Sequence, residues 1–417
     1  MDVRRANELY ELTKRLAAET TSLRDTLLWE FLAGQVEEIF TTEYDLGEVD
    51  RVEQVFGGFE NLSFAVHATG DDGERRYFVR KYKHGTSERE IRYEHKLVRH
   101  IRRKGFDLAA RVFETRSGDT VVTREELVDG ERVDRYFAVY EILEGENKYS
   151  WVKNRLTDAE FEDAGRVLAR FHYAACDFEP GELVREQPPI MDFLATLPDS
   201  FRQLAQGSTG TKFEAVLVAE LPGILESIDR GLTLAPELEG LPRCPVFCDY
   251  HPGNHKWVDE HSVGLFDFDW AKLDYRLFDV AVGLVYFCSS WEDADDGEIR
   301  LDKVELFLKA YQQEATRHTA PGPLTDAELA ALPRMMAIAA MYVVNWDIVA
   351  YYKEDSPNDD EYLFFLEHNV AFVKYIESHL QELEALTASA GGVAATKADA
   401  ASDVVAGGST PESEVSV

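Results

Sequence analysis

Hydrophobic side chains recur near helical spacing over the first 42 residues of the chain. The spaced positions are Leu9, Leu12, Leu16, Leu23, Leu27, Leu28 and Phe31. An apolar stripe with this period is typical of an amphipathic helix. We therefore predict an N-terminal helical extension over residues 1–44.

Residues 48–145 carry a different pattern, in which short β-branched and aromatic runs are separated by turn residues. The pattern predicts strands over residues 52–55, 64–68, 77–82, 111–115, 121–127 and 136–143. Ser87 and Glu90 have the spacing of a capping box, which predicts one helix over residues 87–104. This region is therefore predicted to be a small lobe of mostly antiparallel strands with a single helix.

Helical periodicity dominates from residue 157 onward. It predicts helices over residues 157–178, 189–206, 211–231, 300–317, 325–353 and 359–388. A hairpin over residues 245–270 is the one β segment expected among them. The fold class is therefore α+β, with a small β lobe and a larger helical lobe that carries the hairpin.

The same patterns suggest where the domains begin and end. The small lobe is predicted to occupy residues 45–143 and the helical lobe residues 144–386. Residues 387–417 are rich in Ala, Gly, Ser and Thr and are acidic. Such a composition cannot form a packed core, so we predict a disordered tail.

The charge balance narrows the range of partners. The 417 residues include 44 Lys+Arg and 78 Asp+Glu, which give a formal net charge of −34. This excess repels nucleic acid and anionic membranes, so neither is an expected partner. A hydrophobic content of 45% and an aromatic content of 12% indicate a packed globule rather than a disordered acidic chain. Because salt screens self-repulsion, the acidic surface suggests a halophilic protein.

Cysteine usage and the amino terminus bear on the compartment. Four cysteines in a chain of this length do not form a disulfide framework. The first residues are charged and lack the apolar core of a signal peptide, and the apolar run from Met335 to Val344 is too short to span a membrane. We therefore expect a cytoplasmic protein.

The most informative chemistry lies in the predicted hairpin. Asp249 is followed by Asn254 five residues later and by Asp267 after 18 residues, at the end of an apolar run. In phosphoryl transfer an aspartate can accept the proton of the attacking hydroxyl, and amide and carboxylate oxygens can hold Mg²⁺. We predict Asp249 as the catalytic base and Asn254 and Asp267 as metal ligands. Asp269 either adds a second carboxylate ligand or orients the first.

Four segments carry a resemblance to a known family: Asp249 to Asn254, Phe266 to Asp269, Asp279 to Ala281, and Gly165 to His172. Over residues 45–375 the chain resembles the aminoglycoside/choline phosphotransferase family, and within it the branch of type II homoserine kinases and stress-response kinases. The resemblance implies a protein-kinase-like fold, ATP and Mg²⁺ as cofactors, and a small-molecule hydroxyl as phosphate acceptor.

The resemblance also implies a nucleotide site in the small lobe. Gly57 and Gly58 lie between the first two strands, where a loop covering the nucleotide belongs, and Asn61 and Ser63 resemble the family's polar residues there. The following strand places Arg80 at the position of the kinase lysine.

Strand alternation points Lys81 to the opposite face, so Arg80 is the expected phosphate-binding residue, with Glu94 as its partner. Glu141 and Leu143 lie at the crossover between the lobes, where backbone groups are expected to meet the adenine. Asp279 resembles the aspartate that braces the catalytic loop.

The chain departs from the family in the catalytic loop. Phe247 stands where the family usually has histidine, and Cys248 where glycine is usual. These departures leave open a catalytically impaired nucleotide-binding regulator. A protein Ser/Thr kinase is the second alternative, although Asp279 follows Asp267 by only twelve positions, which disfavours docking of an extended peptide.

Candidate walls of an acceptor pocket are Trp270, Tyr275, Trp346 and Tyr351. An aromatic and acidic pocket would suit a cationic acceptor such as an amino alcohol or amino sugar. A homoserine-like acceptor would need a carboxylate anchor, which the sequence does not identify.

Overall fold

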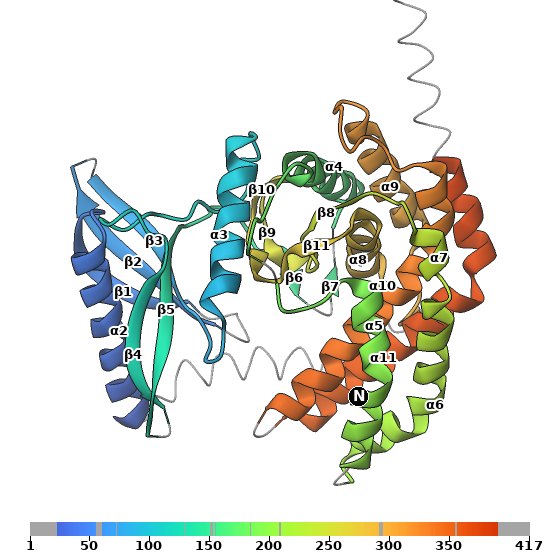
Figure 1. The fold of residues 1–417 in the computed structure, drawn as a ribbon, viewed down its shortest axis with the longest axis horizontal. Helices are drawn as coiled ribbons and strands as arrows, with labels where there is room; N and C mark the ends of the chain where they lie inside the picture. Colours follow the sequence, from blue (N-terminus) through green and yellow to red (C-terminus); the bar gives the residue numbers. More distant parts are fainter. Residues whose placement is uncertain are drawn as a thin grey trace, which may run out of the picture.

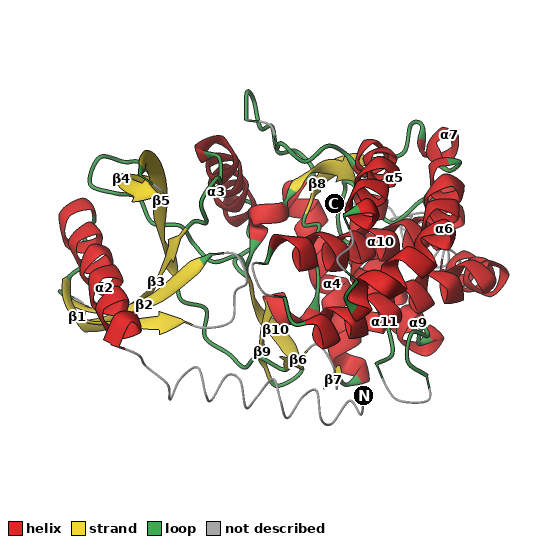
Figure 2. Ribbon diagram, turned by 90° about the horizontal axis from the view of Figure 1, so that it is seen from below, coloured by secondary structure: helices red, strands yellow, loops and turns green. Residues whose placement is uncertain are grey.

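The protein is described by a computed structural model (Figures 1 and 2). The described residues are 23–55, 61–71, 73–128, 130–150, 153–154, 156–183, 185–207, 210–291, 295–354 and 357–390. The first 22 residues of the predicted N-terminal helix and residues 391–417 of the predicted tail lie outside them.

The smaller lobe is built on a five-stranded antiparallel sheet in the order β1-β2-β3-β5-β4. Its strands are β1 (Glu48–Val55), β2 (Leu62–Gly70), β3 (Gly73–Lys81), β4 (Val122–Val128) and β5 (Glu131–Glu141). Helix α2 (Leu23–Glu43) covers the outer face of the sheet, and α3 (Glu88–Arg103) lies on the side of the larger lobe (Figure 1).

The two faces of this sheet bury separate clusters of side chains. Val36, Ile39 and Phe40 of α2 pack on residues such as Phe64 and Val79 in the outer cluster. On the inner face, Ile91 of α3 packs with Tyr82 and Tyr140. Strand alternation explains how one sheet serves both faces. Because its two sides are covered by different helices, the small lobe is a three-layer unit.

Two local predictions in this lobe are wrong. Residues 111–115 form no strand, and Val112 makes only an isolated bridge to Tyr140. The Ser87 side chain makes no capping hydrogen bond. Glu90 instead accepts a hydrogen bond from the Glu186 backbone N–H and faces Arg185 at 3.4 Å, so its carboxylate is engaged by the other lobe.

The larger lobe is mainly helical. Its helices are α4 (Asp158–Ala175), α5 (Ile190–Gln206), α6 (Lys212–Leu232), α7 (Ala235–Leu238), α8 (Arg276–Cys288), α9 (Leu301–Ala315), α10 (Asp326–Lys353) and α11 (Asp359–Ser378). Beyond α11, residues 380–390 are helical as well. The α+β class and the two lobes agree with the prediction, whereas α8 was not predicted. Nearly every α8 residue is buried, so the helix lacks the polar face that makes a helical period visible.

Within the described residues, the β structure of this lobe comprises three short antiparallel ladders rather than one hairpin. The pairs are β6 (Tyr149–Ser150) with β7 (Lys153–Asn154), β8 (Arg243–Val246) with β11 (Lys272–Tyr275), and β9 (His255–Val258) with β10 (His261–Leu265). In the second ladder, strand β8, which precedes the predicted catalytic loop, pairs with strand β11, which follows Asp267. This pairing holds the two ends of the segment from Asp249 to Asp267 side by side.

Helix α10 is long and apolar enough to cross a membrane by composition alone, and 72% of its most apolar window is buried inside the protein. A buried core helix has the same composition. Its N-terminus is closed by a capping box between Thr325 and Glu328, and similar boxes begin α4 and α6.

Helices α4 and α9 are in close contact at Gly165. A Cβ atom on this residue would lie 2.3 Å from the carbonyl oxygen of Phe307, closer than real Cβ contacts allow. The glycine therefore lets α9 pack against α4, which carries His172 toward the predicted catalytic loop.

We predict that Gly165→Ala destabilises the protein by about 1–3 kcal/mol or more, because α4 and α9 must separate to admit a methyl group. The shift in the urea unfolding midpoint measures the effect. Gly34→Ala is the matched control, since Gly34 is exposed on α2 and a Cβ atom added there would meet nothing within 4 Å. The control should be neutral or stabilising by up to about 1 kcal/mol. Equal midpoints for the two variants would contradict the packing argument.

Candidate active site

The predicted catalytic loop between β8 and β9 is held by one buried carboxylate. Asp279 of α8 accepts hydrogen bonds from the backbone N–H groups of Phe247 at 2.7 Å and Cys248 at 2.8 Å. The same carboxylate lies 3.0 Å from His172 Nε2, whose Nδ1 is 2.8 Å from the Tyr311 hydroxyl. Asp279 and His172 are fully buried, so these bonds fix the loop without competition from water.

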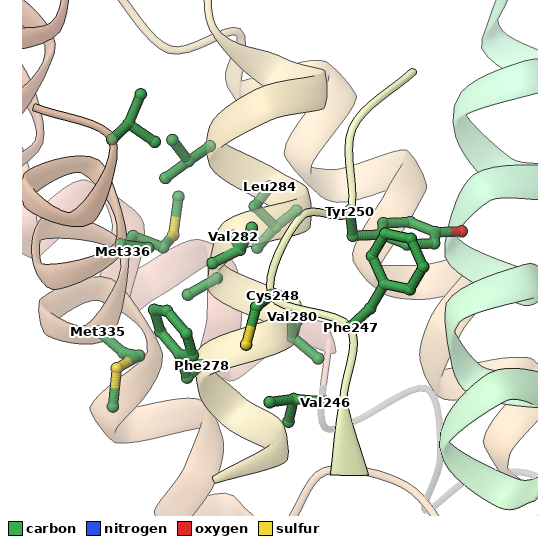
Figure 3. Packing of buried hydrophobic residues seen from close by; sticks show 14 of the residues in the cluster. Val246, Phe247, Cys248, Tyr250, Phe278, Val280, Val282, Leu284, Met335 and Met336 are labelled. Atoms are coloured by element: carbon green, nitrogen blue, oxygen red, sulfur yellow. The ribbon is translucent and has the colours of Figure 1, made fainter. Parts of the chain in front are cut away.

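The two residues that depart from the family pattern are accommodated on opposite sides of the loop (Figure 3). Phe247 makes edge-to-face contacts with Phe171 and Phe268. Cys248 is buried and has a left-handed backbone with φ of 67°. That conformation explains why glycine suits this position. Neither departure removes the hydrogen bonds to Asp279.

Asp249 follows directly after the braced residues. Asn254 donates two 2.9 Å hydrogen bonds from Nδ2, one to the Asp249 carboxylate and one to its backbone oxygen. His251 Nε2 lies 3.5 Å from the same carboxylate, and His251 Nδ1 accepts a hydrogen bond from the Gly253 N–H. The Asp249 side chain is one-quarter exposed, so it is positioned by the protein and still reachable by a substrate.

Asp267 follows the β9–β10 ladder and meets the other lobe. Its carboxylate forms a 2.5 Å ion pair with Arg80 of β3, and its backbone is left-handed with φ of 70°. The pair joins residues 187 positions apart in the chain. The sequence predicted Glu94 as the partner of Arg80, and Glu94 does lie at ion-pair distance, 3.7 Å away. Asp267 is the closer partner, which sequence reasoning missed.

Arg80 is 7% exposed, and two of its nitrogens, Nε and one terminal Nη, have no hydrogen-bond partner among the described residues. Burial lowers the pKa of Arg80, but Asp267 and Glu94 raise it by more, so the guanidinium stays charged. Lys81 points to the other side of the sheet, as predicted, and binds Glu126 at 2.6 Å. A buried guanidinium with spare donors is suited to an anionic ligand.

Asp269 lies in a short turn after Asp267 and shares this charged cluster. Its Oδ2 accepts a 3.3 Å hydrogen bond from Asn61 and is 3.9 Å from Arg80, while its buried Oδ1 has no partner among the described side chains and backbone. Burial, and then the charge of Asp267, raise the pKa of Asp269 to about 8. A cation bound between these two acidic groups would stabilise both in their charged forms.

Glu94 connects Arg80 to a buried polar network in the small lobe. Its carboxylate accepts hydrogen bonds from the Tyr82 and Tyr140 hydroxyls at 3.2 and 3.0 Å. His95 adds contacts of 3.1 and 2.8 Å to the same two hydroxyls. Burial raises the pKa of Glu94, and Arg80 opposes that rise. The network fixes the position of α3 relative to β3.

The other residues assigned to the nucleotide are placed as follows. Gly57 and Gly58 lie outside the described residues. Ser63 lies directly opposite Arg80 in the β2–β3 register. The Glu141 N–H donates to the Arg111 carbonyl at 2.8 Å. The Leu143 side chain lies against Gly264 of β10, where a Cβ would come within 2.9 Å of it.

The aromatic residues named as acceptor walls belong to different surroundings. Tyr351 stacks on Phe213 at 3.9 Å between ring centroids, and Trp270 lies under Lys83. Trp346 lines a cavity with the buried carboxylate of Asp347, a residue that sequence reasoning missed. The only signal for Asp347 in the sequence is an acidic residue inside the apolar stretch of α10.

The donor set of this cluster has the chemistry that Mg²⁺ prefers. Within the described ranges, no group of three or more His, Cys, Asp or Glu side chains has the arrangement of a complete metal site. Mg²⁺ in phosphoryl-transfer sites uses one or two carboxylates together with waters and substrate phosphates. The carboxylates of Asp267 and Asp269, the latter with an unpartnered buried oxygen, and the amide oxygen of Asn254 match that smaller requirement.

Comparison with known proteins places the chain in a family. The profile of the phosphotransferase enzyme family matches residues 51–318. A homoserine kinase of Parvibaculum lavamentivorans is 26% identical over 306 residues, which cover 73% of this chain and 82% of that enzyme. A protein of Deinococcus radiodurans is 30% identical over 273 residues, 65% of this chain and 70% of its own length.

Two solved structures share the fold. A microcompartment-associated aminopropanol kinase has a TM-score of 0.59 at 17% identity, and the match covers 84% of this chain and 98% of that one. A spectinomycin phosphotransferase has a TM-score of 0.57 at 14% identity, with coverage of 83% and 98%. The chain has the protein-kinase-like fold that its two lobes predicted, belongs to the phosphotransferase enzyme family, and is an ATP-dependent phosphotransferase with an alcohol group as acceptor.

Proposed function

We propose that this enzyme transfers the γ-phosphate of ATP, with Mg²⁺, to a hydroxyl group of a small molecule such as an amino alcohol, an amino sugar or a homoserine-like compound. The supporting observation is a chain of contacts: Asn254 binds the Asp249 carboxylate, the Asn254 carbonyl accepts a hydrogen bond from the N–H of the residue before Asp267, and Asp267 pairs with Arg80 of the other lobe. Two relatives that align with 73% of this chain are homoserine kinases. An aminopropanol kinase has the same fold.

In the proposed mechanism Asp249 is the catalytic base. Asn254 holds one Asp249 oxygen at 2.9 Å, which leaves the rest of the carboxylate to orient the acceptor hydroxyl and take its proton as the bond to phosphorus forms. The proton moves from the hydroxyl to Asp249, and the phosphoryl group leaves the nucleoside diphosphate in line with the attack.

Arg80 and the acidic cluster form the phosphate side of the proposed site. Asn254, Asp267 and Asp269 would hold Mg²⁺, which when bound supplies charge neutralisation to the phosphates. Arg80 would direct Nε, which makes no hydrogen bond to the described residues, to the phosphate oxygens. Glu94 would keep the guanidinium in place through its 3.7 Å ion pair.

The segment between Asp267 and Asp279 favours a small acceptor over a protein. Residues 272–275 pair with β8 as strand β11, and Ala271 and Asp274 are fully buried. This stretch, all of it among the described residues, is therefore part of the folded core. It leaves no extended segment at this point of the fold on which a peptide chain could dock.

The direct test measures ADP release from ATP and Mg²⁺ with a panel of acceptors. The panel holds homoserine, ethanolamine, choline, amino sugars and a generic protein, at several salt concentrations. Acceptor-dependent turnover with a small hydroxyl compound would support the proposal. Turnover with the protein alone, or nucleotide binding with no turnover on any acceptor, would contradict it.

We predict that Asp249→Asn lowers kcat by roughly 10²–10⁴-fold, because an amide of the same size cannot accept the hydroxyl proton. The KM for ATP should change little. Steady-state ADP release measures both constants. Asp259→Asn is the matched control: Asp259 lies in the β9–β10 turn with a left-handed φ of 52°, which asparagine adopts readily. Full activity of the Asp249 variant would exclude its role as base.

We predict that Arg80→Lys keeps the fold but raises the KM for ATP about tenfold or more, because an ammonium group cannot replace the forked contacts of a guanidinium. Arg76→Lys is the control, since Arg76 lies on the same strand, is exposed and pairs with Glu144. Nucleotide titration of both variants, alongside their melting temperatures, separates binding from stability. An unchanged KM in the Arg80 variant would remove this residue from the phosphate site.

A further inference from the structure

A small cavity of about 20 Å³ lies among α8, α10 and α11 in the helical lobe. Its lining combines aromatic rings with polar side chains. Its lining residues include Tyr286, Trp291, Trp346, Asp347 and Asn369. This combination differs from the purely apolar voids of a packed core.

Asp347 is the unusual member of this lining. It is 1% exposed, and one of its carboxylate oxygens accepts a 2.7 Å hydrogen bond from Asn369 Nδ2. In the part of the chain that the structure describes, no Lys, Arg or His side chain forms an ion pair with it. An ionised carboxylate buried without a cation is costly. Burial raises the pKa of Asp347 well above its ordinary value, and the bond from Asn369 offsets only part of that rise.

The cavity adjoins the predicted catalytic loop through Tyr286. The Tyr286 ring lies 5.4 Å from the His251 ring, measured between centroids. His251 Nε2 in turn lies 3.5 Å from the Asp249 carboxylate. The Tyr286 ring and the His251 ring are therefore the two side chains that lie between the cavity and the proposed base. Tyr286 also belongs to α8, the helix that supplies Asp279.

We propose that this cavity is the subsite for the amine of the phosphate acceptor, in which Asp347 pairs with a primary ammonium group while the acceptor hydroxyl lies at Asp249. The inference rests on the proposed function and narrows its acceptor to alcohols that carry a primary amine. An ammonium group gives Asp347 the missing cation. The indole of Trp346, which also lines the cavity, would add cation–π attraction.

The size of the cavity sets its selectivity. Its volume of about 20 Å³ is close to the roughly 10–15 Å³ that one water-sized group requires. A primary ammonium group is of that size and donates three hydrogen bonds. A trimethylammonium group is much larger and donates none, so choline should be a poor ligand.

The test is a calorimetric titration of the full-length protein with Mg²⁺ and a non-hydrolysable ATP analogue. The ligands are ω-amino alcohols from ethanolamine to 6-amino-1-hexanol, the matching diols, and choline. One chain length of amino alcohol should bind most tightly, because it spans the distance from the cavity to Asp249. Asp347→Asn should weaken that ligand at least about 30-fold and leave the diols unchanged.

Two further variants complete the design. Asp199→Asn changes the same charge at an exposed position, where the side chain is 96% accessible, and controls for long-range attraction of amines to this acidic protein. Asp347→Glu keeps the charge but adds a methylene group that fills the cavity, and it should also lose amine binding. The melting temperature of Asp347→Asn should equal or exceed that of the wild type, because an amide of the same size replaces a buried group that is costly to ionise.

Several outcomes would overturn the subsite. They are amine affinity that is unchanged in Asp347→Asn, choline that binds as tightly as the best primary amine, and the absence of amine binding to the wild type. The acceptor panel separates this failure from that of the proposed function. Phosphorylation of alcohols without an amine would leave the kinase standing and the subsite refuted. Asp347-dependent amine binding without any turnover would support the subsite and contradict the proposed kinase function.

Discussion

The geometry of the candidate active site depends first on the carboxylate of Asp279. Two consecutive backbone N–H groups, those of Phe247 and Cys248, are bound by it before the chain reaches Asp249. The contact with His172 extends the arrangement to α4 and, through Tyr311, to α9. Because the carboxylate is fully buried, each of these bonds is expensive to leave unmade. Helices from three parts of the sequence therefore jointly hold the loop in its observed conformation.

The second constraint is the charge cluster between the lobes. Arg80 lies within ion-pair distance of Asp267, Glu94 and Asp269, and among the described residues no other Lys or Arg is paired with these three carboxylates. The imbalance is chemically informative, because such clusters usually persist where a ligand supplies the missing charge. In the proposed function, a metal ion would supply positive charge to this cluster and reduce the negative charge of the bound nucleotide.

Several parts of this molecule could be predicted from its sequence, for identifiable reasons. Asp249 and Asn254 lie in one loop, where close sequence spacing nearly determines spatial proximity. The partnership of Arg80 with Asp267 could not be predicted in the same way, because it depends on how two lobes approach each other.

Burial explains the other failures. Helix α8 shows no helical period because almost every side chain is inside the protein. Asp347 lies in a stretch of α10 whose sequence is typical of a core helix, and only the structure revealed a buried carboxylate with a neutral hydrogen-bond partner. Ser87 was expected to cap α3, but Glu90 is engaged by Glu186 and Arg185 of the other lobe. Predictions from local sequence patterns were thus wrong or incomplete where contacts with distant parts of the chain determined a residue's surroundings.

The left-handed backbone at Cys248 has a consequence for how this loop can change during evolution. A side chain in that conformation costs roughly 1–2 kcal/mol, yet the residue is fully buried against the helical core. Glycine would relieve the backbone and leave a small void, whereas a β-branched residue would satisfy neither demand. Sequence drift at this position is therefore confined to small, unbranched residues, although the side chain itself takes no part in the chemistry.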